Sequence, residues 1–360
     1  MNYILTTVGL SILTNYEPLR ALGLYNYSNL DEKELDSDFL NKFESIYKEL
    51  ENEILQYSEQ KIKRASAELN AILSFYNDKI KTQDIHQLLH TDTYLGKKSA
   101  QLIQIYLEKK MNMSAILITS SDLKTSNIEE FQMAISDLIV TLSEELTSYK
   151  SAGYKIIFNL TGGFKSINSF LQTIASLYAD ESIYIFETSS ELLIVPKLPI
   201  QIDKTVVVEN LDIFRKLYLG LSTDGKRLKS IPKSLIIQID KEYTLSAWGE
   251  LMWNEIKNEE YEKRFLVSPY LKLKFSKEFE KKVESLQPNR LYELNKKIDD
   301  LVTYLKFKTN PKSLNFKILQ GSPKVNSTHE FYINSDEAKR GYCHFDRKNN
   351  LVIDEYGKHL

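Results

Sequence analysis

The stretch Asn159-Leu-Thr-Gly-Gly-Phe-Lys165 decides the fold of the first half of this chain. It follows Tyr154-Lys-Ile-Ile-Phe158, an apolar run typical of a buried strand, and precedes residues 166–179, whose apolar spacing predicts a helix. A glycine pair and a lysine between strand and helix suit an anion, because backbone N–H groups and a positive charge can both approach a phosphate. A tight turn in which glycine only relieves strain is the alternative, and the spacing is not that of a Walker loop.

Strands and helices alternate over the first 200 residues. We expect strands at residues 3–8, 85–89, 115–118, 154–158, 182–187 and 192–195. We expect helices over residues 38–76, from residue 94 to about 110, and over 127–149 and 166–179. This alternation predicts an α/β domain with a parallel sheet and helices on both faces.

The carboxyl ends of these strands carry small, polar or glycine-bearing segments. Ligands of parallel sheets bind beyond these ends, so the segments predict a nucleotide-type pocket. The candidate ligand-binding residues are Gly9, Leu10, Ser11, Thr91, Asp92, Ser120, Asn159, Thr161, Gly162, Gly163, Phe164 and Lys165.

The last ninety residues follow a different pattern. After a bridge at 201–267, a strand at 270–275 precedes a helix that Ser276 can cap and a second helix over 288–304. Short strands are expected at 316–319, 328–333, 339–345 and 351–354. We therefore expect three parts: a domain at 1–200, the bridge, and an α+β module at 268–360 with two helices and an antiparallel sheet.

Charge and histidines concentrate in this module. Residues 268–360 hold 18 Lys and Arg against 12 Asp and Glu, while the other residues hold 29 against 37. A basic module suggests a polyanionic partner, although a lysine-rich solvated surface would look the same. Three of the five histidines, His329, His344 and His359, lie there, and Arg340, Lys317 and Glu330 belong to the same expected sheet. Such a set can supply the base, cation and acid for metal-free RNA cleavage, although a surface or structural role is commoner for any one histidine.

Other classes fit poorly. The single cysteine, Cys343, excludes an internal disulfide and fits a reducing cytoplasm. Residues 2–13 lack the basic start of a signal peptide, and no apolar run is long enough to cross a membrane. No Cys/His cluster has zinc spacing and no Gly-x-Ser-x-Gly elbow occurs, so we expect no metal, no cofactor and no membrane partner.

The N-terminal part resembles the CARF domains of type III CRISPR ancillary proteins. The resemblance rests on residues 6–14, Ser66-Ala-Glu-Leu-Asn70, Thr91-Asp-Thr93, the 159–165 stretch, and Leu-Ser-Ala-Trp-Gly-Glu at 245–250. It implies a Rossmann-like homodimer that binds a cyclic oligoadenylate, most often cyclic tetra-adenylate, as an activating ligand. In members that degrade this ligand, the positions matching Ser11 and Lys165 contact the phosphate under attack.

The C-terminal part is similar to the RelE/YoeB/HigB toxin fold. The similar patterns are Asn310-Pro311, Leu319-Gln-Gly321, Lys339-Arg-Gly-Tyr342 and Gly357-Lys-His359. The resemblance implies a ribonuclease that cuts mRNA on the ribosome, with Arg340 stabilising the phosphorane and His359 as general acid. Lys317 or Glu330 would assist the 2′-hydroxyl, and Tyr356 could stack on a base.

These observations lead to a hypothesis of a cytoplasmic, homodimeric ribonuclease that a cyclic oligoadenylate activates. A stand-alone ring nuclease with a non-catalytic C-terminal module is one alternative. A ligand-controlled regulator that binds nucleic acid without cutting it is another.

Overall fold

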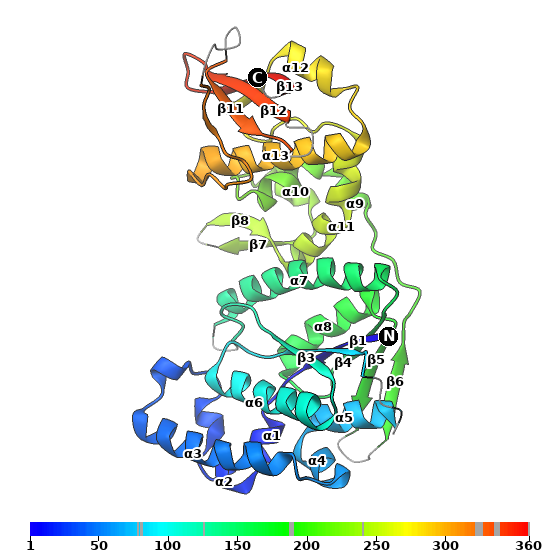
Figure 1. Ribbon diagram of the computed structural model, residues 1–360. Helices are drawn as coiled ribbons and strands as arrows, with labels where there is room; N and C mark the ends of the chain where they lie inside the picture. Colours follow the sequence, from blue (N-terminus) through cyan, green and yellow to red (C-terminus); the bar gives the residue numbers. More distant parts are fainter. Residues whose placement is uncertain are drawn as a thin grey trace. The chain divides into compact units, whose positions relative to one another are not determined.

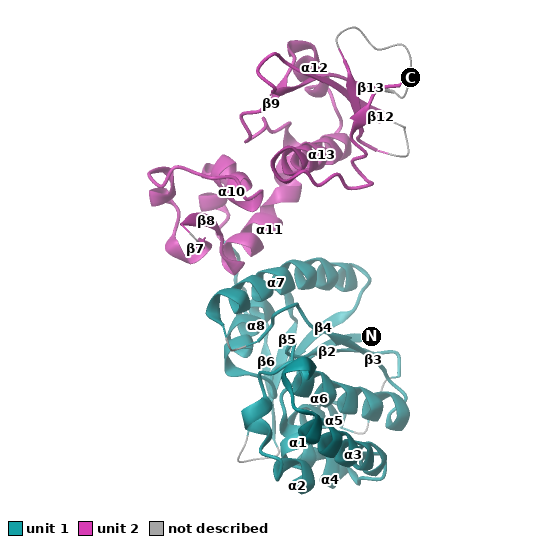
Figure 2. Cartoon of the chain, turned by 90° about the vertical axis from the view of Figure 1, so that its left-hand side faces the viewer, with its two compact units in different colours: residues 1–202 teal, residues 203–360 magenta. Residues whose placement is uncertain are grey.

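The chain forms two compact units, Met1–Ile202 and Asp203–Leu360 (Figure 2). The structure is a computed structural model that describes residues 1–77, 79, 82–124, 127–186, 191–239, 241–320, 327–334 and 339–358. Among the helices of these residues, none combines the length and the apolar character that crossing a membrane requires.

Unit 1 is built on one six-stranded sheet with the order β3-β2-β1-β4-β5-β6. The strands are β1 (Asn2–Thr7), β2 (Ile85–Leu89), β3 (Ser114–Ile118), β4 (Lys155–Asn159), β5 (Glu181–Ile185) and β6 (Leu192–Pro196). The first five pair in parallel, which confirms the predicted Rossmann-like α/β sheet. β6 is antiparallel to β5, so the prediction was wrong for this strand. The reason is chain length, because residues 186–191 are too few for a parallel crossover.

Helices cover both faces of this sheet (Figure 1). α5 (Ala67–Tyr76) and α6 (Tyr94–Ile105) lie on one face, and α7 (Ile128–Ser151) and α8 (Lys165–Tyr178) lie on the other (Figure 1). The remaining helical elements of this unit are α1 (Ser11–Thr14), α2 (Glu17–Arg20), η1 (Leu24–Tyr27), η2 (Glu32–Glu34), α3 (Ser37–Ile54), α4 (Glu59–Ala65) and the π-helical turn η3 (Tyr106–Lys110).

The single helical region expected over residues 38–76 is three helices. Ser58 and Ser66 separate them, and each serine oxygen accepts a hydrogen bond from a backbone N–H three residues on, at Lys61 and Leu69. A serine cap accepts a hydrogen bond from an N–H group that the first turn of a helix leaves without a partner. It therefore favours the start of a new helix over continuation of the preceding one. Thr93 begins α6 in the same way, with its hydroxyl accepting from the Gly96 N–H.

One hydrophobic core of unit 1 lies between the sheet and helices α3, α5 and α6, and α7 and α8 bury apolar side chains of their own. α3 contributes Phe39, Phe43, Tyr47, Leu50 and Ile54, whose spacing of three and four residues places them on one buried face. Burying each such side chain contributes about 1.5–3 kcal/mol. Packing of this face therefore holds a helix whose opposite face is charged.

Unit 2 begins with a small helical part. It contains α9 (Thr205–Glu209), α10 (Leu211–Tyr218), η4 (Arg227–Ser230), η5 (Lys233–Leu235), the antiparallel hairpin of β7 (Ile236–Ile239) and β8 (Glu242–Leu245), and α11 (Ala247–Lys263). The core of this part gathers around Trp253, Phe214 and Tyr261.

The C-terminal part of unit 2 has the expected β-α-α-β-β-β-β order. Its elements are β9 (Leu273–Phe275), α12 (Lys277–Val283), α13 (Pro288–Phe307), β10 (Lys317–Ile318), β11 (His329–Tyr332), β12 (Lys339–Phe345) and β13 (Leu351–Lys358). The sheet order is β10-β11-β12-β13-β9, with antiparallel pairs except for β9, which pairs in parallel with β13. The sheet is therefore mixed rather than wholly antiparallel. Ser276 caps α12 as expected, accepting from the Phe279 N–H at 3.0 Å.

A buried arginine joins the two parts of unit 2. Arg215 of α10 donates from Nε to Asp299 of α13 at 2.8 Å, and from Nη1 to the carbonyl oxygens of Leu266 and Val267 at 3.0 Å. The Tyr261 hydroxyl donates to the same carboxylate. Separating a buried charge pair costs free energy of folding. This contact therefore couples the bridge segment to the C-terminal part of unit 2.

Candidate functional site

The loops after β1 and β4 meet where the strand order of unit 1 reverses. β2 and β3 continue the sheet on one side of this point, and β5 and β6 continue it on the other. Ligands of doubly wound sheets bind at this switch point. A Cβ atom on Gly9 would lie 2.9 Å from the Gly163 nitrogen, so the two loops touch. The structure thus brings together the first and last segments of the predicted pocket.

The glycine pair is required by the geometry of this contact. Gly163 has φ of +88°, and a Cβ there would lie 2.9 Å from the Thr7 Cβ. A Cβ on Gly162 would overlap the side chain of Glu68. Both the left-handed backbone and the close approach exclude larger residues. The glycines are therefore needed for a tight turn, which was the alternative explanation of the motif. The same turn also places backbone next to the exposed Lys165.

Glu68, on α5, is the centre of this region, and the sequence did not identify it as a site residue. The side chain is fully buried. Its carboxylate accepts hydrogen bonds from the Gly9 N–H, the Ser11 hydroxyl and the Ser66 hydroxyl, each at 2.8 Å. Buried carboxylates require such donors, because an unpaired charge in the interior is strongly destabilising. The sequence did contain a signal for this role, because Glu68 is a charged residue on the same helix face as the apolar Ile72.

The hydrogen bonds of Ser11 restrict what it can offer a ligand. Its proton is donated to Glu68, and its oxygen accepts from the Ala67 N–H at 3.1 Å. A hydroxyl has one proton, so Ser11 cannot donate to a phosphate while it donates to Glu68. The Glu68 carboxylate therefore accepts the hydrogen bonds of Gly9 and Ser11, two residues that the sequence analysis assigned to ligand binding.

Asn159 and Thr161 hold the second loop in place. The Asn159 amide donates to the carbonyl oxygen of Glu68 at 3.2 Å, and the Thr161 hydroxyl accepts from the Ile185 N–H at 3.2 Å. The Gly162 carbonyl accepts from Thr7 and from Asn168, each at 2.8 Å. These side chains fix the loop conformation from both sides.

Lys165 and the start of α8 supply the positive charge. Lys165 is exposed, and its ammonium group has no hydrogen bond or ion pair within the described residues. Phe164 precedes the helix and gives no side-chain cap. An uncapped helix N-terminus beside a free ammonium favours an anion. Among the described residues, none competes with an anion for this part of the predicted site.

The other predicted ligand residues lie at the same edge of the sheet. Thr91 and Asp92 follow β2, and Ser120 follows β3. The Thr91 hydroxyl bonds to Thr93 at 2.9 Å, and the Asp92 carboxylate accepts from the Asp122 N–H at 2.9 Å. Leu10 is half-buried at the start of α1. The structure places these residues, and their contact with a ligand stays a prediction.

In unit 2, the predicted catalytic residues Lys317, Glu330 and Arg340 share one face of the sheet. Lys317 pairs with Glu330 in register, and their charged atoms lie 3.2 Å apart. Arg340 lies opposite Tyr332, with its guanidinium 3.6 Å from the ring centroid. Side chains alternate along strands, so Glu330, Tyr332 and Arg340 lie away from the buried Phe331.

Accessibility separates these three residues. Glu330 is 5% exposed and Arg340 is 8% exposed, whereas the Lys317 side chain is 41% exposed. Tyr356 is 4% exposed, with its ring in the core between sheet and helices, and its stacking role stays a prediction. His359 lies outside the described residues, so its role stays a prediction.

The histidines of this sheet lie on opposite faces. His329 belongs to the core face, stacked on Phe316 with 5.2 Å between ring centroids, and burial lowers its pKa. His344 lies on the face of Arg340, because the two are four positions apart on β12.

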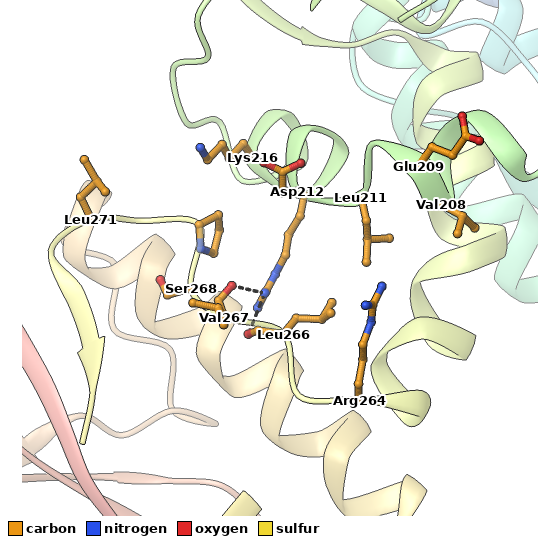
Figure 3. Close-up of a pocket in the computed structure, with 12 residues that line it drawn as sticks. Val208, Glu209, Leu211, Asp212, Lys216, Arg264, Leu266, Val267, Ser268 and Leu271 are labelled. Carbon is orange, nitrogen blue, oxygen red and sulfur yellow. Dashed lines mark hydrogen bonds between the residues drawn. The ribbon is translucent and has the colours of Figure 1, made fainter. Parts of the chain in front are cut away.

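Unit 2 also contains a cavity of about 490 Å³ that the sequence did not predict. Arg264, Leu266 and Val267 line it from the segment after α11, and Leu211 and Asp212 line it from α10 (Figure 3). Several of its charges are already paired: Arg264 with Glu260, and Asp212 with Arg227. Across the described part of the chain, no cluster of three or more His, Cys, Asp or Glu residues is arranged to hold a metal ion.

Fold and site define unit 1 as a doubly wound α/β unit with an anion-favouring loop at its switch point. Residues 63–198 match the model of a family described as CRISPR-associated protein (Cas_APE2256). This region is under half of the chain, and it contains Glu68, the loop after β2 and the 159–165 stretch. Unit 1 is thus similar to a CRISPR-associated family over most of its length.

A solved structure of Enterococcus italicus Csm6 bound to cyclic hexa-2'-fluoro-hexa-dAMP is also similar at 12% sequence identity. The similarity covers 87% of this chain and 58% of that chain, with a TM-score of 0.28.

Proposed function

We propose that this protein is a type III CRISPR ancillary effector in which unit 1 is a CARF domain that binds a cyclic oligoadenylate. The observation that carries the proposal is the contact between the Gly9 loop and the Gly162–Lys165 loop at the switch point. The second of these loops lies in the segment similar to a CRISPR-associated family. Phosphates of the ligand would face the start of α8 and Lys165.

The proposed ligand is cyclic tetra-adenylate, and the proposed assembly is a homodimer through unit 1. A cyclic tetranucleotide is compatible with two-fold symmetry, so two identical Lys165 loops could each face one phosphate. Adenine rings would extend along the strand ends toward Thr91, Asp92 and Ser120.

We propose further that unit 2 is a RelE-like endoribonuclease that cleaves mRNA, with the ribosome as the site of action. Support comes from the β-α-α-β-β-β-β order and from Lys317, Glu330 and Arg340 on one sheet face. Arg340 is largely covered, so it must become exposed before it can meet a phosphorane. Ligand binding in unit 1 would favour that exposed state.

Cleavage of the ligand by unit 1 is a second proposed activity. Ser11 and Lys165 are the candidate residues, and both belong to the loops at the switch point. Glu68 must first release the Ser11 hydroxyl, since this proton is already donated. Such a reaction would be slow and would limit the lifetime of the signal.

The proposal is tested by adding cyclic tetra-adenylate to the full-length protein with translating ribosomes and mapping the mRNA cuts. We expect ligand-dependent cuts that Arg340→Ala and His359→Ala reduce at least tenfold. Calorimetry with tetrameric and hexameric rings measures binding, and Lys165→Ala should weaken it. Absence of heat with both rings would refute the sensor. Binding without mRNA cleavage would refute the effector alone and leave the stand-alone ring nuclease.

A further inference from the structure

A histidine and a carboxylate form a close pair on the sheet of unit 2. Nδ1 of His344, on β12, lies 2.9 Å from both carboxylate oxygens of Asp354, on β13. The His344 side chain is 29% exposed and that of Asp354 is 16% exposed. The pair is thus more accessible than Glu330 or Arg340 on the same face.

A β-bulge places Asp354 in this position. Tyr342 pairs with Glu355 and Cys343 pairs with Ile353, so Asp354 is the extra residue on β13. Bulges redirect a side chain and are common beside active sites. The Asp354 carbonyl accepts from the Ser276 hydroxyl at 2.7 Å, and its carboxylate accepts from the Ser327 hydroxyl at 2.8 Å. Hydrogen bonds therefore fix both the backbone and the side chain of Asp354.

The partner determines which nitrogen of His344 carries the proton. An ionised carboxylate only accepts hydrogen bonds, so Nδ1 must donate to Asp354. In the neutral ring, Nε2 then has a free lone pair. The carboxylate also stabilises the imidazolium that forms when Nε2 takes a proton, which is the function of an orienting carboxylate in general-base catalysis.

His344 lies in line with the other predicted residues. Arg340, Tyr342 and His344 alternate along β12, so consecutive members are about 7 Å apart. Tyr342 pairs in register with Glu330, which in turn pairs with Lys317. An RNA backbone lying across this face could place a phosphate beside Lys317 and a ribose beside His344.

The earlier candidates for the base are less suitable. Glu330 is 5% exposed, and its carboxylate lies 3.2 Å from the ammonium group of Lys317. His344 combines a fixed tautomer with a side chain that is 29% exposed.

We propose that His344 is the general base of RNA cleavage by unit 2 and that Asp354 is its positioning residue. The inference rests on the proposed ribonuclease function. Nε2 takes the proton of the 2′-hydroxyl, the 2′-oxygen bonds to phosphorus, and the bond from phosphorus to the 5′-oxygen breaks. The 5′-oxygen takes a proton from the general acid, the role proposed above for His359, which leaves a 2′,3′-cyclic phosphate and a 5′-hydroxyl. Lys317 and Arg340 stabilise the phosphorane charge.

The experiment measures single-turnover cleavage of mRNA on ribosomes by the full-length protein with saturating cyclic tetra-adenylate. His344→Asn keeps an amide donor to Asp354 but has no Nε2, so the rate should fall at least 100-fold while melting temperature and ligand binding stay as in the parent. In His344→Ala, added imidazole should restore part of the rate. Lys274→Gln, which removes an exposed cation from the same sheet, should cleave within twofold of the parent.

Asp354 is tested by a split between kcat and KM. Asp354→Asn should lower kcat about tenfold with KM unchanged, because the ring loses its fixed tautomer, and Asp354→Glu should recover part of the loss. If the parent cuts mRNA but His344→Asn cuts within threefold of it, the inference fails and the ribonuclease proposal stands. If the parent makes no cuts, both fail. Parent products lacking 2′,3′-cyclic ends would also overturn the inference.

Discussion

Glu68 contacts both loops of the candidate ligand site. Its carboxylate accepts from Gly9 and Ser11 in the first loop, and a Cβ on Gly162 of the second loop would overlap it. A negative charge buried beside an anion site has two effects. It holds the loops together, and it repels the phosphate that these loops are proposed to bind.

Glu68→Gln should therefore change stability and affinity in opposite directions. The free energy of unfolding should fall by about 1–3 kcal/mol, because charge-assisted hydrogen bonds become neutral or lose their acceptor. The affinity for cyclic tetra-adenylate should rise about fivefold, since roughly 1 kcal/mol of repulsion is removed and Ser11 regains its proton for the ligand. Urea denaturation and calorimetry measure the two quantities.

Ser11→Ala is the matched control for this prediction. It removes one donor to Glu68 but leaves the negative charge, so it should not increase affinity. An unchanged or lower affinity in Glu68→Gln would show that the carboxylate does not compete with the ligand.

At the scale of elements, a buried polar cluster ties β1, β2 and α5 together. The Tyr76 hydroxyl donates to Asp84 at 3.0 Å and lies 3.1 Å from His86 Nε2, and the Asn2 N–H donates to the same aspartate at 2.7 Å. His86 is fully buried, and burial lowers its pKa to about 4. His86 Nδ1 has no hydrogen-bond partner within the described residues, so protonation would bury an unpaired charge.

Acid should destabilise unit 1 through His86. The folded-state pKa lies below the ordinary value of 6.5, so the unfolded chain takes up a proton first as the pH falls. The stability that depends on neutral His86 is fully present above about pH 6.5. Between pH 6.5 and 4 the free energy of unfolding falls by about 1.4 kcal/mol per pH unit. Denaturation at several pH values measures the slope. His86→Gln should flatten it in this window, and equal slopes in both proteins would contradict the assignment.

At the scale of the whole molecule, the proposed sensor and the proposed effector occupy different units. Lys165 belongs to unit 1, whereas Arg340 belongs to unit 2. In a protein where ligand shifts a two-state equilibrium, a sensor residue determines how much ligand is needed. An effector residue determines the rate once the equilibrium has shifted.

Titration of cleavage with cyclic tetra-adenylate should separate the two units. Lys165→Ala should raise the ligand concentration at half-maximal cleavage by about tenfold and leave the plateau unchanged, because one phosphate contact is lost. Arg340→Ala should lower the plateau and leave the midpoint in place. A lowered plateau for Lys165→Ala at saturating ligand would contradict this division.

The sequence by itself determined the strands of the unit 1 sheet and the glycine–lysine segment of the candidate ligand site. Residues 85–89 and the helix after Lys165 were predicted to within one residue, because apolar periodicity and glycine positions are local properties of the chain. The parallel sheet followed from the alternation of strands and helices.

Only the tertiary structure decided which distant groups meet. The Ser11–Glu68 hydrogen bond joins residues 57 positions apart. A bulge in β13 brings Asp354 next to His344 on the neighbouring strand β12. The parallel pairing of β9 with β13 likewise depends on register between distant segments. Local pattern cannot specify such contacts, because they form when packing of the whole unit selects one register and one loop conformation among several.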